Sequence, residues 1–352
     1  MQHPTTPERA IRAMATSLHW DGGELVDPVG GFQRWTAAGV RSSGQAIGYG
    51  DLFDTLAVSP SGRYQALYTR RGTKALLLDG TNLVRELNRS YYQAEAYDYP
   101  IALGRLPDGR EVVAHCPDEY NRLQIDDAAT GKPLARMTGE CGDYFHSRLQ
   151  FSPDGRHLLV NGWFWHPEAT VEVHDVLASL SDPGALGVNM LREGGGGDCG
   201  GQGDDGSECW QADPWRGEAA GACWLAADRI AVIEVPDGFE DGDAGAEFSG
   251  TTTLAVLTPH GEVLSRNPVE VNAGVLLACG DNVLNLHGHP TLLNPVTGRT
   301  VAAWPHLDAG NTDVSYGLGP TRLPAAAYHP ERRELALAQG DRIVVLGLGS
   351  LG

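Results

Sequence analysis

The chain of 352 residues carries 26 lysines and arginines against 45 aspartates and glutamates, for a net charge of −19 at pH 7. Such a charge repels phosphate backbones and anionic lipid surfaces, so we expect no nucleic-acid partner and no membrane partner. Hydrophobic residues make up 41% of the chain, enough for a sizeable core, yet no apolar run approaches the roughly 18 residues that a membrane-spanning helix needs.

The first seventeen residues lack the apolar run of a secretory signal. They predict a short helix in which Thr6 is the cap, Pro7 takes the first helical position and Glu8 lies in the first turn. Without export, reduced thiols are the expected state of the cysteines, and we expect a cytoplasmic protein. The six cysteines are scattered along the chain, at Cys116, Cys141, Cys199, Cys209, Cys223 and Cys279.

A tight-turn signature between apolar runs recurs along the chain. SPSG stands at 59–62, LPDG at 106–109 and SPDG at 152–155, so successive turns are 46 or 47 residues apart. Proline sets φ for the second residue of such a turn and glycine takes the unusual φ at its end, which is typical of a β-hairpin. Weaker copies follow at 227–228, 280–281 and 329–330.

Each turn lies inside the same unit of four short, largely apolar strands. This spacing is the sequence signature of a propeller blade, so we expect an all-β chain that forms a single β-propeller of about six four-stranded blades. The third unit has a less regular fourth strand. The six units occupy residues 55–87, 101–137, 148–176, 221–267, 274–304 and 324–349.

The last unit ends without an outer strand. Because an unpaired edge exposes backbone donors and acceptors, we expect the N-terminal region to close the ring, through residues 18–20 or 32–35. The chain is therefore divided into an N-terminal helix and ring-closing region, 1–50, and a propeller, 51–352, with an acidic, glycine-rich insertion at about 193–220. A seventh blade built from residues 18–50 is the alternative.

The run SPDGR at 152–156, followed by an apolar strand, and the DAATGK motif at 127–132 resemble the WD-repeat and related bacterial propeller superfamily. The resemblance covers about residues 52–347. It implies the fold without implying one activity, because that superfamily includes scaffolds and a few enzymes. The Gly-His and Trp-Asp dipeptides of standard WD repeats do not recur here, which implies a divergent member. Residues 88–101 and the run NGWFWHP at 161–167 are also similar to uncharacterised bacterial propellers.

Strand order in a four-stranded meander predicts where long loops gather. The first-to-second and third-to-fourth connections share one face of the ring, and here they are mostly minimal turns, with 177–187 as the exception. The second-to-third and blade-to-blade connections share the other face, where scaffolds commonly place binding chemistry. The long, aromatic and charged loops belong to this second class, at 88–99, 116–122, 140–148, 163–168, 194–221, 236–250 and 306–321.

Four of these loops are rich in tyrosine, tryptophan and arginine, the residues that dominate binding energy at interfaces. They predict a binding surface for a protein or peptide partner. The alternative is that the same aromatic side chains pack between blades. The predicted binding residues are Arg89, Tyr91, Tyr92, Glu95, Tyr97, Tyr99, Glu119, Tyr120, Arg122, Tyr144, His146, Arg148, Trp163, Trp165 and His166.

Residues 193–250 hold fourteen acidic side chains against two arginines. Such a segment cannot bury much apolar area, so we expect it to be flexible and suited to a basic partner or a divalent cation, although Asp204, Asp205 and Glu208 match no calcium loop. Cys199 and Cys209 are expected to be free thiols, with zinc or a disulfide as the alternative. Neither a cofactor nor a metal site is predicted.

His287 and His289 lie on one side of a predicted strand, and we interpret them as polar surface, with a metal site as the alternative. The leading functional hypothesis is a binding scaffold without chemistry of its own. The alternative is a propeller hydrolase or lyase, with or without a divalent ion, that uses His146, Glu119 and Arg148 at the channel mouth. A third hypothesis is sugar stacking on Trp163 or Trp165.

Overall fold

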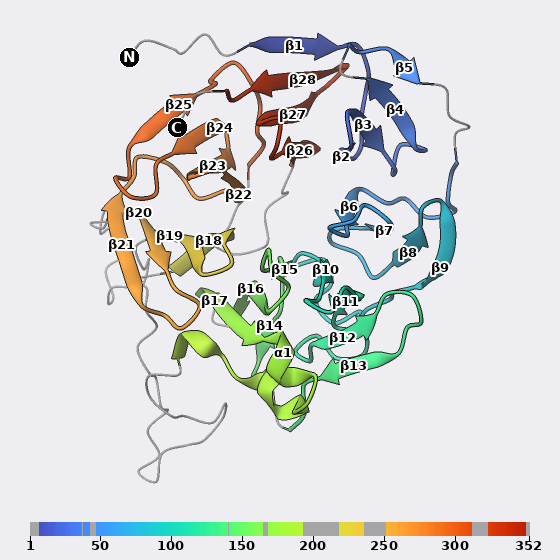
Figure 1. Cartoon of the computed structure of the whole chain (residues 1–352), viewed down its shortest axis with the longest axis vertical. Helices are drawn as coiled ribbons and strands as arrows, with labels where there is room; N and C mark the ends of the chain where they lie inside the picture. The colour runs from blue at the N-terminus through green and yellow to red at the C-terminus, as the bar shows by residue number, and fades with distance from the viewer. Residues whose placement is uncertain are drawn as a thin grey trace.

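The computed structural model of the chain describes residues 7–36, 38–42, 47–139, 141–164, 168–192, 218–235, 251–311 and 323–349. Their strands form seven sheets arranged around a ring (Figure 1). The prediction of an all-β propeller is confirmed, and the number of blades is seven, because residues 19–42 form a blade of their own. The short strands of this extra blade explain why its pattern is weak in the sequence.

Blades 1 to 3 are regular four-stranded meanders. They consist of β2 (His19–Asp21), β3 (Glu24–Asp27), β4 (Gln33–Thr36) and β5 (Arg41–Ser42); β6 (Thr55–Val58), β7 (Tyr64–Tyr68), β8 (Ala75–Asp79) and β9 (Asn82–Glu86); and β10 (Ile101–Arg105), β11 (Glu111–His115), β12 (Gln124–Asp127) and β13 (Pro133–Arg136).

Blades 5 and 6 repeat this pattern, and blade 7 completes it with a strand from the start of the chain. They consist of β18 (Glu218–Ala226), β19 (Arg229–Val235), β20 (Thr253–Leu257) and β21 (Val263–Pro268); β22 (Val275–Cys279), β23 (Asn282–His287), β24 (His289–Leu293) and β25 (Thr300–Ala303); and β26 (Ala326–His329), β27 (Glu334–Gln339) and β28 (Arg342–Gly347) with β1 (Glu8–Ile11).

The ring is closed by β1, which runs antiparallel beside β28 (Figure 1). Closure by the N-terminal region is confirmed, but the predicted helix at Pro7 and Glu8 is wrong, because Glu8 begins a strand; Thr6 lies outside the described residues. The predicted closing segments, 18–20 and 32–35, contribute to β2 and β4 of blade 1 instead. Helix propensity is a weak prior, and pairing with the open edge of β28 outweighs it.

Blade 4 departs from the meander, as its irregular fourth strand predicted. Its innermost strand is interrupted between two short pieces, both of which pair with the same second strand. As far as the chain is described here, short helical segments rather than a fourth strand follow the third one. The elements are β14 (Tyr144–Phe145), β15 (Gln150–Phe151), β16 (His157–Phe164), β17 (Glu168–Asp175), the helix α1 (Val176–Ser179) and the 3₁₀ turns η1 (Pro183–Gly187) and η2 (Met190–Arg192).

The described residues form seven clusters of buried hydrophobic side chains, and each cluster lies between two neighbouring blades. A sheet covered on both faces explains why strands such as β8 and β28 read as nearly continuous apolar runs rather than alternating ones. The predicted hairpin turns are confirmed, since Gly62, Gly109 and Gly155 all have positive φ. Gly155 requires glycine for a second reason besides its positive φ, because a Cβ atom there would lie 1.9 Å from the Arg105 carbonyl oxygen.

Antiparallel pairing within each blade places successive connections on alternate faces of the ring. The second-to-third and blade-to-blade connections therefore share one face, which we call the loop face. The loops at 88–99, 116–122 and 140–148 lie on it, apart from residue 140, which is not described. Most of 163–168, 194–221, 236–250 and 306–321 falls outside the described residues. Among the described helices, none has the length and apolar character needed to cross a bilayer.

Candidate functional site

The predicted binding residues separate into a buried set and a surface set. Tyr91, Tyr92, Glu95 and Glu119 are exposed, and a partly buried group lies beside them. The buried residues are Arg89, Tyr97, Tyr99, Tyr144 and His146; the partly buried ones are Tyr120, Arg122, Arg148 and Trp163; Trp165 and His166 lie outside the described residues.

Arg89 organises the loop between blades 2 and 3 from inside. Its Nη2 donates to the carbonyl oxygens of Ala94 at 2.6 Å and Tyr97 at 3.1 Å, and its Nε donates to that of Gly72 at 2.7 Å. The guanidinium also lies over the rings of Tyr97 and Tyr99, 4.3 and 4.7 Å from their centroids. Burial lowers the pKa of Arg89. These contacts make Arg89 a brace for the loop rather than a surface ligand.

Tyr99 and Tyr144 are also used internally. The Tyr99 hydroxyl donates to the Leu87 carbonyl oxygen, and burial raises the pKa of this tyrosine. The Tyr144 hydroxyl accepts from the Gly162 backbone N–H at 3.1 Å, across the interrupted edge of blade 4. For these residues the packing alternative describes what the side chains do.

The surface set is built on a stack of aromatic rings. The buried Phe145 ring lies 4.4 Å from Trp163 with the planes nearly parallel, and 4.5 Å from Tyr120. Tyr92 contacts Tyr120 at 4.9 Å and is 48% exposed, and Tyr91 beside it is 81% exposed. We call the side chains of Tyr91, Tyr92, Tyr120 and Trp163 the aromatic platform. It joins the loops of blades 2, 3 and 4.

Acidic side chains lie in the same loops as the aromatic platform. Glu95 and Asp143 are exposed, and Asp143 accepts a hydrogen bond from the Tyr120 hydroxyl. Glu119 receives Arg122 Nε at 3.1 Å, while Arg122 Nη1 donates to the Met137 carbonyl oxygen at 3.0 Å. Burial, together with Asp143, raises the pKa of Tyr120. The platform is therefore held by its own hydrogen bonds and carries an acidic rim.

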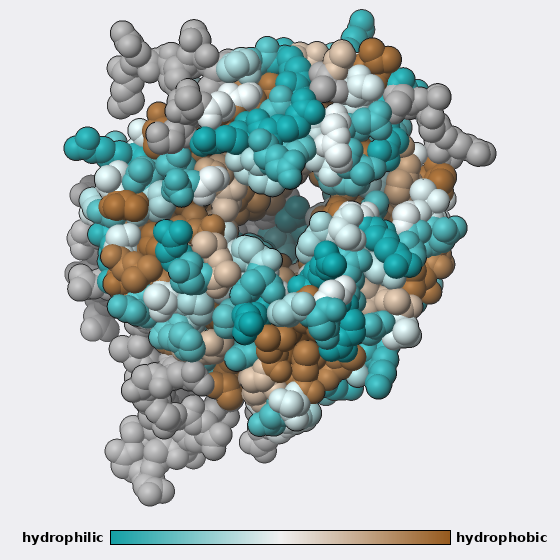
Figure 2. All heavy atoms as spheres, viewed as in Figure 1, coloured by the Kyte–Doolittle hydropathy of each residue, from teal (hydrophilic) through white to brown (hydrophobic). Residues whose placement is uncertain are grey.

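The centre of the ring is hollow (Figure 2). A cavity there is lined by residues of blades 1, 2, 6 and 7, including Asp54 and Arg70. Asp98 forms an ion pair with Arg70 at 3.3 Å and lies 4.0 Å from Arg71. Sequence reasoning did not identify these charges, because nothing in the chain marks which loop residues turn toward the axis.

The three residues predicted for acid/base chemistry have separate partners. Glu119 pairs with Arg122, Arg148 donates from Nη1 to the Ala220 carbonyl oxygen at 3.3 Å, and His146 is buried against Asn121. Among the described residues, no hydrogen bond or ion pair joins His146, Glu119 and Arg148 to one another.

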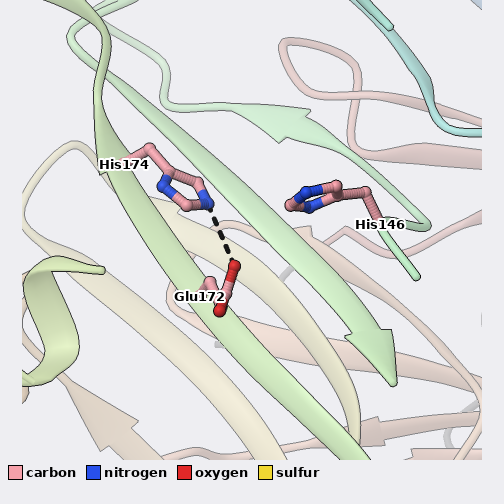
Figure 3. Close-up of side chains that lie close together, drawn as sticks. All are labelled: His146, Glu172 and His174. Carbon is pink, nitrogen blue, oxygen red and sulfur yellow. Dashed lines mark ion pairs between the residues drawn. The ribbon is translucent and has the colours of Figure 1, made fainter. Parts of the chain in front are cut away.

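His146 lies instead beside Glu172 and His174, two residues of β17 that the sequence did not single out (Figure 3). One ligand atom from each of the three side chains falls within 4.8 Å of the others. His174 Nε2 is 3.3 Å from Glu172 Oε2. Burial lowers the pKa of His146 to about 4, with Glu172 opposing this shift, so its ring is neutral near pH 7. Alternation along β17 was the available signal, since polar residues, Glu172 and His174 among them, alternate with Ala169, Val171 and Val173.

His287 and His289 do not share one strand, contrary to prediction. They face each other across a tight turn at Gly288, the first at the end of β23 and the second at the start of β24. Cys199 and Cys209 lie outside the described residues. Burial raises the pKa of Cys223 and Cys279 to about 12, so these thiols stay protonated and unreactive near pH 7.

The ring of seven sheets defines the class of protein, a seven-bladed β-propeller. No protein-family model matches the chain, and no curated protein matches it.

Proposed function

We propose that the protein is a recognition scaffold, and that the aromatic platform binds a basic peptide segment of a protein partner. The observation that carries the proposal is the exposed Tyr92, whose ring stacks on the buried Phe145, with the still more exposed Tyr91 next to it in the chain. Isolated exposed apolar residues need no explanation, but exposed rings supported by a preorganised stack supply contact area at low entropic cost.

The charge around the aromatic platform supports a basic partner. Exposed Glu95, Glu119 and Asp143 lie in the same loops as the rings, and tyrosine faces attract lysine and arginine side chains. Exposed rim charges mainly accelerate association and select partners, and their effect is screened by salt. We therefore expect binding to weaken as ionic strength rises.

Internal hydrogen bonds in the loops of blades 2 and 3 also support recognition rather than movement. Arg89 and Arg122 use backbone carbonyl groups to hold the loops of blades 2 and 3 in place. A preordered surface loses little conformational freedom when it binds.

A photocrosslinking amino acid introduced in place of Tyr91 tests the proposal directly. The matched control is the same substitution at Val296, an exposed apolar residue in a third-to-fourth strand turn on the opposite face of the ring. We expect discrete crosslinked partners from position 91 only, and we expect Glu95→Lys/Glu119→Lys to reduce their yield about tenfold or more. Equal crosslinking from both positions, or yields unchanged by charge reversal, would contradict the proposal.

A further inference from the structure

The buried cluster of His146, Glu172 and His174 is independent of the aromatic platform. It arises because the innermost strand of blade 4 is interrupted between β14 and β15, which leaves His146 free to face β17. Glu172 and His174 are two residues apart on β17, so period-two alternation places both on the same side of the sheet. His146 is thereby brought to two residues that lie 26 and 28 positions further along the chain (Figure 3).

Backbone carbonyl groups determine which ring nitrogens carry hydrogen. His146 Nε2 is 3.2 Å from the Asn121 carbonyl oxygen, and His174 Nδ1 is 3.2 Å from that of Val188. A carbonyl oxygen only accepts, so both of these nitrogens must donate. The opposite nitrogens, His146 Nδ1 and His174 Nε2, have no hydrogen-bond partner among the described residues. Metal-binding histidines have this arrangement, in which a second-shell acceptor holds one nitrogen and orients the other.

The two ring nitrogens without a hydrogen-bond partner are buried, and their burial has an energetic cost. His146 and His174 are each 1% exposed, whereas the side chain of Glu172 is 14% exposed. A buried polar atom without a partner carries a desolvation cost, so a group that completes its coordination is favoured. The two imidazoles offer lone pairs, and the carboxylate offers negative charge.

We propose that His146 Nδ1, His174 Nε2 and the Glu172 carboxylate form a binding site for a divalent transition-metal ion of the zinc type. Two imidazoles and one carboxylate are a known zinc donor set, and they leave at least one coordination position open. His174 Nε2 and Glu172 Oε2, 3.3 Å apart, already have the separation that two ligands about 2 Å from one ion require. Tetrahedral ligands at that bond length are roughly 3.4 Å apart, and the three ligand atoms lie within 4.8 Å of one another, so only a small adjustment of the side chains is needed to hold an ion.

The competing interpretation is an ion pair between protonated His174 and Glu172, with His146 as a neutral neighbour. That arrangement satisfies the pair but leaves His146 Nδ1 without a partner. The two interpretations differ in one measurable respect, because only the metal site makes Zn²⁺ affinity depend on His146.

The test is a Zn²⁺ titration of chelator-treated full-length protein in competition with a chromophoric chelator. It compares the natural chain with Glu172→Gln and His146→Gln, and uses His287→Gln/His289→Gln as the matched control. We expect the natural chain and the control each to bind one Zn²⁺. Both site variants should bind it at least about 100-fold more weakly, because even changes outside the ligand shell reduce metal affinity 10- to 100-fold. Ca²⁺ and Mg²⁺ should not compete, since they prefer oxygen ligands.

The cysteine pair needs its own control. Cys199→Ser/Cys209→Ser should retain the site, and Co²⁺ bound to this variant should show the spectrum of nitrogen and oxygen ligands without thiolate bands. Glu172→Gln preserves side-chain volume at a partly exposed position, so it keeps the test valid if His146→Gln disturbs folding. Equal Zn²⁺ affinity in the natural chain and a folded Glu172→Gln variant, or loss of the bound ion in the cysteine variant, would overturn the proposal.

Discussion

Within the described residues, neither blade 4 nor blade 7 has a fourth strand that follows its third one along the chain, and the two blades compensate in opposite ways. Blade 7 borrows β1 from the start of the chain, so its ladder is complete and its interior is apolar. Blade 4 is followed by α1 and η1 instead, and its innermost strand is interrupted as well. In blade 7 no buried side chain of the described strands is polar, whereas the interrupted strand of blade 4 admits His146 into the interior.

The largest effect is expected where β1 joins blade 7. Ile11 is 3% exposed and packs in the hydrophobic cluster between blades 7 and 1. Ile11→Ala should lower the free energy of unfolding by about 3 kcal/mol, because it removes buried methyl groups and leaves a cavity. Urea unfolding measures this loss. A change below about 1 kcal/mol would mean that backbone pairing alone closes the ring.

A smaller loss is expected in blade 4 when its irregular edge is crowded. A Cβ atom at Gly162 would lie 2.3 Å from the Phe145 carbonyl oxygen and 2.7 Å from the Tyr144 ring. Gly162→Ala should therefore cost about 2 kcal/mol in unfolding free energy, since backbone must shift to accept the methyl group. Gly50→Ala, where nothing lies within 4 Å, is the control and should be nearly neutral. Equal stability of the two variants would show that the β14 edge is loose.

The smallest effect concerns the ion pair that links β1 to β27. Arg9 donates to Glu334 at 2.6 Å, and this hydrogen bond is the main reason that the pKa of Glu334 lies below its ordinary value of 4.5. A depressed pKa stabilises the folded chain above about pH 4.5, and this contribution is lost as the pH falls through the folded-state value. Arg9 is 35% exposed, so we expect less than about 1 kcal/mol.

Comparing urea midpoints of the natural chain and Arg9→Met at pH 7 and pH 3 measures that contribution. The two proteins should differ at pH 7 and converge at pH 3. Arg332 also contacts Glu334 at 3.0 Å and should preserve part of the pH dependence in the variant. A difference that persists at pH 3 would assign the effect of Arg9 to packing rather than to charge.

The repeat in the sequence was sufficient to predict the propeller and its loop face, because each blade is specified locally. Turns such as LPDG at 106–109 and apolar runs such as β8 act within one unit of about 47 residues. Which aromatic residues are exposed and which are buried could not be predicted in the same way. Tyr91 and Tyr97 stand six positions apart in one loop, yet the first is exposed and the second is buried under Arg89.

The periodic pattern of turns and strands, read alone, determined the fold class, the need for an N-terminal closing strand and the face that carries the long loops. Tertiary structure alone decided that Glu8–Ile11 is the closing strand, that residues 19–42 form a seventh blade, and that His146 meets Glu172 and His174. The physical reason is how far apart along the chain the interacting residues lie. Turn geometry and strand alternation depend on neighbours a few residues away, whereas edge pairing and side-chain clusters depend on segments that only ring closure and blade packing bring together.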